Sequence, residues 1–110
     1  MSETERIALR ALAERMVRLD RRVRSLLLFG SRARGDSSRD SDLDVAVRVR
    51  GRRDAALERR IVAEFAEVEW APPLEGAVRI SPLVRFDRRR RAPVDASIES
   101  EGVTVWKARA

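Results

Sequence analysis

The chain has 110 residues, so we expect residues 1–110 to form a single small domain. It contains no cysteine and no histidine, which excludes disulfides, zinc sites and an imidazole general base. Any metal must be held by oxygen atoms, which favours magnesium, manganese or calcium. The formal net charge is +6 and arginine supplies nearly all the basic residues, so acidic partners are favoured.

The first half of the chain predicts one helix followed by two strands. Residues 2–19 have an amphipathic pattern, with Ser2 and Glu5 placed as a capping box. Residues 25–30 are apolar and end at Gly30, which is typical of a central strand covered on both faces. Residues 42–50 alternate strictly, which predicts a strand with one core face and one open face. The open face carries Asp42, Asp44, Ala46, Arg48 and Arg50.

The second half predicts a helix, a strand, a charged loop, a short helix and a last strand. The helix covers about residues 52–70, and its inward side chains are predicted to be Leu57, Ile61, Val62, Phe65, Ala66 and Val68. The strand at about 77–86 contains Pro82, whose missing N–H favours a sheet edge or a bulge. The loop at 87–95 is rich in arginine. The short helix is stopped by Gly102, and the strand VTVW follows.

Residues 30–44, GSRARGDSSRDSDLD, carry the candidate chemistry. Gly30 lets an anion approach the backbone without a Cβ in the way, and the Ser31 hydroxyl can donate to a phosphate. Asp42 and Asp44 are two apart on a strand, so they project from one face, where their like charges favour a cation between them. Together these residues predict a site for a phosphate-bearing ligand and a divalent ion.

Each feature also has a structural interpretation. A Gly-Ser pair is a common turn, and a charged Asp-x-Asp often only begins an exposed strand. Of the arginines between the two halves, Arg34 is the candidate phosphate ligand, and a solvent-facing loop is the alternative. Arg48 and Arg50 share the aspartate face and are candidates for contact with phosphate or a partner. Arg88–Arg91 suit a solvated loop, RNA or an acidic protein surface.

The combination of Gly30-Ser31, ten intervening residues and Asp42-Leu43-Asp44 resembles a known signature. It is similar to that of the minimal nucleotidyltransferases (MNT) of the polymerase-β-type superfamily. LVRF at 83–86 and IESEGVTVW at 98–106 also resemble the closing segments of such domains. The resemblance extends over most of the chain, from about residue 9 to residue 106.

The resemblance implies an α+β, polymerase-β-like fold, with a mixed sheet of about four strands and helices packed on one face. It implies that Gly30 and Ser31 bind the nucleotide phosphates, and Arg34 is added to them as a candidate. Asp42 and Asp44 would be the catalytic residues and the ligands of Mg²⁺. The implied reaction is attack of an acceptor hydroxyl on the α-phosphate of a nucleotide such as ATP, which releases pyrophosphate.

Small stand-alone members of this family resemble antitoxins that are encoded beside a HEPN-type ribonuclease toxin. The resemblance therefore implies a toxin protein as partner, a hetero-oligomer with it, and transfer of AMP from ATP onto it. No apolar run approaches the roughly 18 residues that span a bilayer, and we expect a soluble cytoplasmic protein that contacts no membrane.

One departure from the family pattern lies in the third predicted strand. Active members often carry a third acidic residue there, whereas this strand offers Arg79 and Ser81 on the corresponding face. Four other acidic residues are candidates to replace it: Glu75, Asp87, Asp95 and Glu101. Two further hypotheses therefore stay open beside the enzyme. One is a catalytically degenerate antitoxin that only binds its toxin, and the other is a small nucleic-acid-binding protein.

Overall fold

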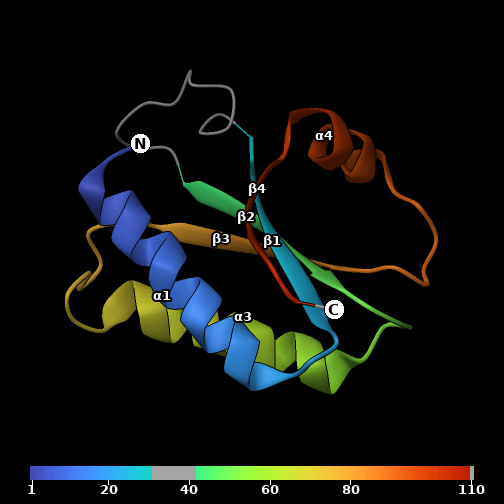
Figure 1. Ribbon diagram of the computed structural model, residues 1–110, viewed down its shortest axis with the longest axis horizontal. Coiled ribbons are helices and arrows are strands. Elements are labelled where there is room, and N and C mark those ends of the chain that lie inside the picture. Colours follow the sequence, from blue (N-terminus) through green and yellow to red (C-terminus); the bar gives the residue numbers. More distant parts are fainter. Residues whose placement is uncertain (31–41, 110) are drawn as a thin grey trace.

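The computed structural model describes residues 1–30 and 42–109. Figure 1 shows helices packed around a twisted sheet. In chain order the described elements are α1 (Glu3–Leu19), β1 (Val23–Phe29), β2 (Leu43–Val49), α3 (Ala55–Trp70), β3 (Ile80–Phe86), α4 (Pro93–Glu101) and β4 (Val103–Lys107). Every predicted element is present, with bounds shifted by at most three residues. None of the described helices is long and apolar enough to cross a membrane.

The strands form one mixed sheet in the order β3-β2-β1-β4. β1 pairs antiparallel with β2 and β4, whereas β2 and β3 are parallel because α3 connects them. β1 and β2 are the inner strands, as the continuous apolar run of β1 predicted. β3 lies at an edge of the sheet, so the expectation drawn from Pro82 is confirmed. At an edge, the missing N–H of Pro82 removes no hydrogen bond between strands. The α+β fold class predicted from the sequence is the one observed.

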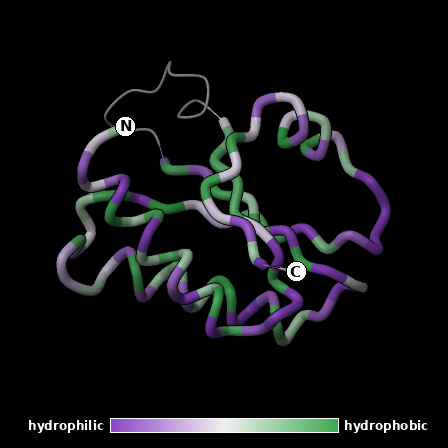
Figure 2. The backbone as a smooth tube through the Cα atoms, viewed as in Figure 1, coloured by the Kyte–Doolittle hydropathy of each residue, from purple (hydrophilic) through white to green (hydrophobic). Residues whose placement is uncertain are grey.

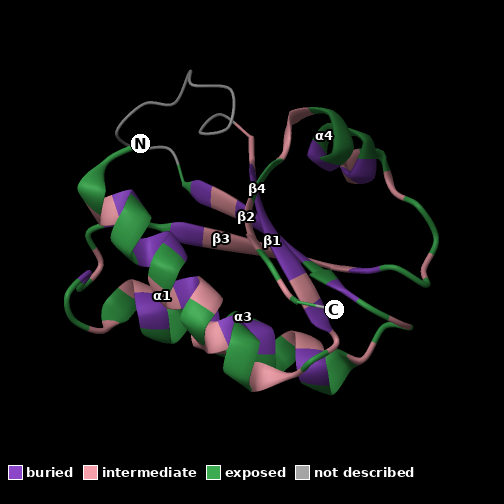
Figure 3. Cartoon of the chain, in the orientation of Figure 1, coloured by how far each residue is buried: buried purple, intermediate pink, exposed green. Residues whose placement is uncertain are grey.

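The main core lies between the sheet and the helices α1 and α3, which pack side by side on one face (Figure 3). The core face of β2 is fully buried at Leu43, Val45, Val47 and Val49, as its alternation predicted. From α3 the core receives Leu57, Ile61, Phe65 and Val68. Val62 and Ala66 were predicted to face inward as well, but both are exposed, Val62 to 44%. Each directly follows a buried residue of α3, Ile61 or Phe65, and so lies beside the buried stripe.

α4 packs on the opposite face of the sheet. Its Ile98 is buried against Leu27 and Ala46, which form a second, smaller apolar cluster. The expectation of helices on one face therefore holds for α1 and α3 only. Ala46 stands among polar residues on the face predicted to be open, and its small side chain lets the short helix approach the sheet closely. The tube in Figure 2 is hydrophilic along residues 87–91, in the loop that leads to α4.

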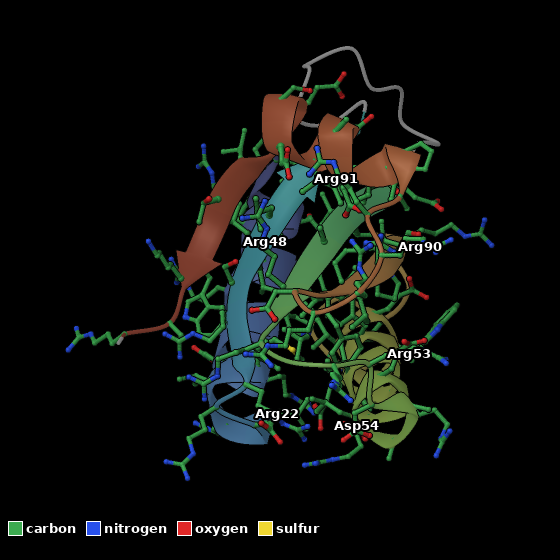
Figure 4. The ribbon with its side chains drawn as sticks, turned by 90° about the vertical axis from the view of Figure 1, so that its right-hand side faces the viewer. Arg22, Arg48, Arg53, Asp54, Arg90 and Arg91 are labelled. Carbon is green, nitrogen blue, oxygen red and sulfur yellow. The ribbon has the colours of Figure 1, made fainter. Side chains whose placement is uncertain are left out.

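The helix ends are fixed by local hydrogen bonds. The predicted capping box of α1 is present, since Glu5 N donates to Ser2 Oγ at 3.1 Å and Ser2 N donates to Glu5 Oε1 at 3.1 Å. α3 begins after Asp54, whose Oδ1 accepts from the backbone N–H groups of residues 56 and 57. Arg22 donates to the other oxygen of Asp54 at 3.1 Å and joins the start of β1 to the start of α3 (Figure 4).

α4 is held to the sheet by a carboxylate that accepts from several donors. Asp95 accepts from Arg85 Nε at 3.0 Å and Arg85 Nη2 at 2.9 Å, from Arg89, and from the backbone N–H of Ala92 at 2.7 Å. The bidentate guanidinium of Arg85, followed by Arg89 and the Ala92 N–H, holds the pKa of Asp95 well below its ordinary value of 3.8. Asp95 is buried, so it links β3, the arginine loop and α4 at one point.

We expect Asp95→Asn to lower the free energy of unfolding at pH 7 by on the order of 2 kcal/mol, because it leaves two guanidinium groups without their carboxylate. A carboxylate with a lowered folded-state pKa stabilises the protein above about pH 4, and this contribution is lost as the pH falls further. Urea denaturation at pH 7 and pH 3 should therefore show a wide gap between wild type and variant that narrows in acid. A gap that stays constant with pH would contradict this role.

Candidate active site

The end of β1 and the beginning of β2 meet at one end of the sheet. Phe29 pairs with Asp44 across the antiparallel ladder, and Gly30 follows directly with φ +76°. A Cβ built on Gly30 would lie 2.5 Å from Oδ2 of Asp44. The Asp44 carboxylate therefore lies against the bare backbone of Gly30, in space that any other residue would fill.

Asp42 and Asp44 flank the buried Leu43 at the start of β2 and project from the face opposite the main core. Asp44 is half-buried and Asp42 is exposed. The strand is fixed at this point by the backbone N–H of Leu43, which donates to the carbonyl of Arg79 at 2.8 Å. Two carboxylates thus project from one side of the strand at this end of the sheet.

The neighbouring strand offers no carboxylate. In the parallel register of β2 and β3, Ser81 is the partner of Asp44, so both side chains project from the same face at adjacent positions. Ser81 is half-buried and Arg79, the other residue considered for this face, is exposed. The strand that lacks the third acidic residue of the family pattern therefore lies directly beside Asp44.

The other acidic candidates do not fill this position. Asp95 is bound to arginines beside α4, and Asp87 accepts from Gly51 N at 2.7 Å at the other end of β3. Glu75 lies in the turn after α3, and Glu101 ends α4. Within residues 1–30 and 42–109, no three acidic groups come together in a cluster that would hold a metal ion.

Ser31 and Arg34, predicted to bind the nucleotide, lie outside the described residues, so Gly30, Asp42 and Asp44 define this end of the sheet. Arg48 and Arg50 are farther along β2, with Ala46 and its contact to α4 between them and Asp44. They belong to a different part of the surface. The sequence did not predict that α4 separates these two regions. Asp95, the first acidic residue after four arginines, was the available signal that an ion pair attaches α4 to the sheet.

The described residues suit a hard divalent ion. Carboxylate oxygens are the donors that Mg²⁺ prefers, and Asp42 and Asp44 present them on one strand face. The carboxylate of Asp44 is seated against Gly30, in the space that a side chain at that position would fill. An ion between the carboxylates and a phosphate would complete its coordination with water or phosphate oxygens.

Comparisons with known proteins identify the family of the chain. The nucleotidyltransferase domain family matches residues 9–99, so the chain belongs to that family. No curated protein sequence gives a significant match.

Two solved structures share the fold. A candidate nucleotidyltransferase from Sulfolobus solfataricus has a TM-score of 0.58 and 21% identity, covering 97% of this chain and 89% of its own. The mutant MntA–HpeT toxin–antitoxin structure, in which two aspartates two positions apart are changed to glutamate, also has a TM-score of 0.58. There the identity is 16%, and the match covers 99% of this chain and 76% of that chain. At these identities the likeness establishes the fold.

Proposed function

We propose that this protein is a Mg²⁺-dependent nucleotidyltransferase that transfers AMP from ATP to a hydroxyl group of a HEPN-type ribonuclease toxin and so acts as its antitoxin. The observation that carries the proposal is the seating of the Asp44 carboxylate against Gly30, beside Asp42. This contact brings Gly30, from the first half of the sequence signature, against Asp44, from the second half. The toxin as partner is supported by the similarity in fold to a toxin–antitoxin structure.

In the proposed reaction, Gly30 with Ser31 and Arg34 binds the phosphates of ATP, and Asp42 and Asp44 hold the magnesium ion. The ion, when bound, neutralises charge on the phosphates and favours ionisation of the attacking hydroxyl. The hydroxyl oxygen forms a bond to the α-phosphorus while the bond to the pyrophosphate oxygen breaks. Ser81 has no charge with which to take the hydroxyl proton, so that proton passes to water or to a base on the acceptor.

A second candidate function is an antitoxin that acts by binding alone. The observation in its favour is Ser81, which stands in register with Asp44 where a carboxylate would complete the acidic set. In this case the fold provides a surface that occludes the toxin, and the site binds nucleotide without transferring it.

The test is incubation of the protein with a HEPN-type toxin as the candidate partner, ATP labelled at the α-phosphate, and Mg²⁺. Transfer predicts label on the toxin that depends on the metal. If the toxin binds tightly and is neutralised but takes no label, the enzyme is excluded and the binding function stands. If the two proteins do not associate at all, both candidates are wrong.

Restoring an acidic residue on β3 should raise the transfer activity. Ser81→Asp places a third carboxylate in register with Asp44, and we expect labelling to be faster by about tenfold or more because a second ion and a proton acceptor become possible. Ser81→Asn is the matched control, since it has the same size without the charge. Equal rates for the two variants would show that β3 takes no part in the chemistry.

A further inference from the structure

A hollow lies on the α4 side of the sheet, at the opposite end from Gly30 and Asp44. It has a volume of about 510 Å³, within the range of ligand sites. Its walls are the late part of β2, the ends of β3 and β4, the start of β1, and α4 with the arginine loop. Figure 4 views this side, with Arg48 on the sheet and Arg91 near the base of α4.

The hollow is strongly basic, because seven basic and three acidic side chains line it. The acidic groups are already engaged: Asp95 with Arg85 and Arg89, Glu99 with both terminal nitrogens of Arg91 at 2.6 and 2.7 Å, and Asp87 with Gly51 N. The bond from Arg91 lowers the pKa of Glu99, so that carboxylate stays ionised and paired.

Four cations of the hollow remain without such a partner. Within the part of the chain that the structure describes, no carboxylate lies at ion-pair distance from Arg24, Arg48, Arg50 or Lys107. Gathering like charges around one hollow is unfavourable unless an anionic group joins them. Guanidinium forks can bind carboxylates in a bidentate manner, so several acidic groups are the matching ligand. Arg90 does not line the hollow and extends away from it (Figure 4).

The walls favour an acidic polypeptide over a nucleic acid. Phe86 is the one aromatic side chain among the described lining residues, and at 3% exposure it offers no face on which a base could stack.

We propose that this hollow docks an acidic segment of the protein partner, as an anchor separate from the site of chemistry. Arg48 is four residues beyond Asp44 on the same face of β2, a separation of about 13 Å along an extended strand. α4, packed on Ala46, stands between the two places. The inference rests on the proposed function in that the partner is the acceptor of the nucleotide, but the docking itself needs neither ATP nor metal.

The test measures binding of a fluorescein-labelled peptide of alternating glutamate and tyrosine by fluorescence anisotropy, without nucleotide or magnesium. We expect binding that weakens with added salt, and a loss of about tenfold or more in affinity in the double variant Arg48→Glu with Arg50→Glu. Both side chains are exposed, so the variant should fold, and a thermal melt followed by circular dichroism verifies it. Arg10→Glu with Arg59→Glu, on the exposed surfaces of α1 and α3, makes the same change in net charge away from the hollow.

Equal losses in the two double variants would mean that bulk charge alone attracts the peptide, and the proposal would be wrong. An oligouridylate of equal charge is compared with the peptide in the same assay. If it binds more tightly than the peptide, and if Arg48→Glu with Arg50→Glu abolishes that binding, the ligand is a nucleic acid and the proposal is wrong. Absence of any peptide binding would also contradict the proposal. The Asp42→Asn and Asp44→Asn variants should bind the peptide normally. A wild-type protein that docks the peptide but transfers no nucleotide would refute the proposed enzyme and leave this anchor standing.

Discussion

Replacing Asp42 and Asp44 together with asparagine is expected to reduce transfer of AMP to the toxin by a factor of at least about 10³. Both carboxylates project from one face at the start of β2, and asparagine keeps their size while removing the charge that holds a divalent ion. Because the side chains are exposed or half-buried, the fold should persist. The measurement is the initial rate of labelling from α-labelled ATP across a magnesium titration.

The matched control removes two negative charges elsewhere. Glu3 and Glu14 are exposed on α1, on the other face of the sheet, and their change to glutamine should leave the labelling rate unchanged. If the aspartate variant labels the toxin as fast as wild type, Asp42 and Asp44 are not the metal ligands. If it neutralises the toxin in cells without labelling it, the neutralisation is due to binding, and the antitoxin role is independent of catalysis.

Most of the fold could be predicted because local patterns and the family resemblance agreed. The strict alternation of β2 assigned its buried and open faces, and that assignment is correct at each of Leu43, Val45, Val47 and Val49. The apolar run of β1 indicated an inner strand, and Pro82 indicated an edge. These signals are local, so each can be read from a few consecutive residues.

The position of α4 could not be predicted in the same way. Its contact with Ala46 and its attachment through Asp95 to Arg85 join residues ten to fifty positions apart, and no local pattern encodes such pairs. The run of arginines after β3 looks like a solvated loop until Asp95 is seen to engage Arg89, and Glu99 to engage Arg91. For the same reason, the basic hollow under α4 emerges only when β1, β2, β3, β4 and α4 are brought together.

The candidate site was predictable in its residue types but not in its closest contact. The sequence placed Gly30 and Asp44 at the ends of two strands, and only the pairing of Phe29 with Asp44 shows that the carboxylate lies against the glycine. Ser81 was expected on the same side, and the parallel register makes it the direct neighbour of Asp44. The identity of the nucleotide-binding residues Ser31 and Arg34 stays a prediction.

The contact between Gly30 and Asp44 leads to the second large effect. Gly30→Ala should lower the transfer rate by about a hundredfold, because its Cβ would lie 2.5 Å from Oδ2 of Asp44 and force the carboxylate out of place. The added methyl group would also obstruct an approaching phosphate. The same substitution strains the backbone at φ +76°, at a cost of roughly 1 kcal/mol, so activity must be separated from stability.

Gly51→Ala is the control that separates an effect on activity from an effect on stability. Gly51 also has a positive φ, at +101°, but a Cβ there meets nothing within 4 Å, and it lies in the turn at the other end of β2. Both variants should therefore lose a similar amount of stability in urea denaturation, and only Gly30→Ala should lose transfer and weaken the response to magnesium. If the two variants lose activity in proportion to stability, Gly30 acts through the backbone alone. A loss of transfer in Gly30→Ala alone means that the end of β1 positions the carboxylate of Asp44 on β2. The same added methyl group would then harm catalysis at Gly30, where it meets Asp44, and leave it intact at Gly51, where it meets nothing.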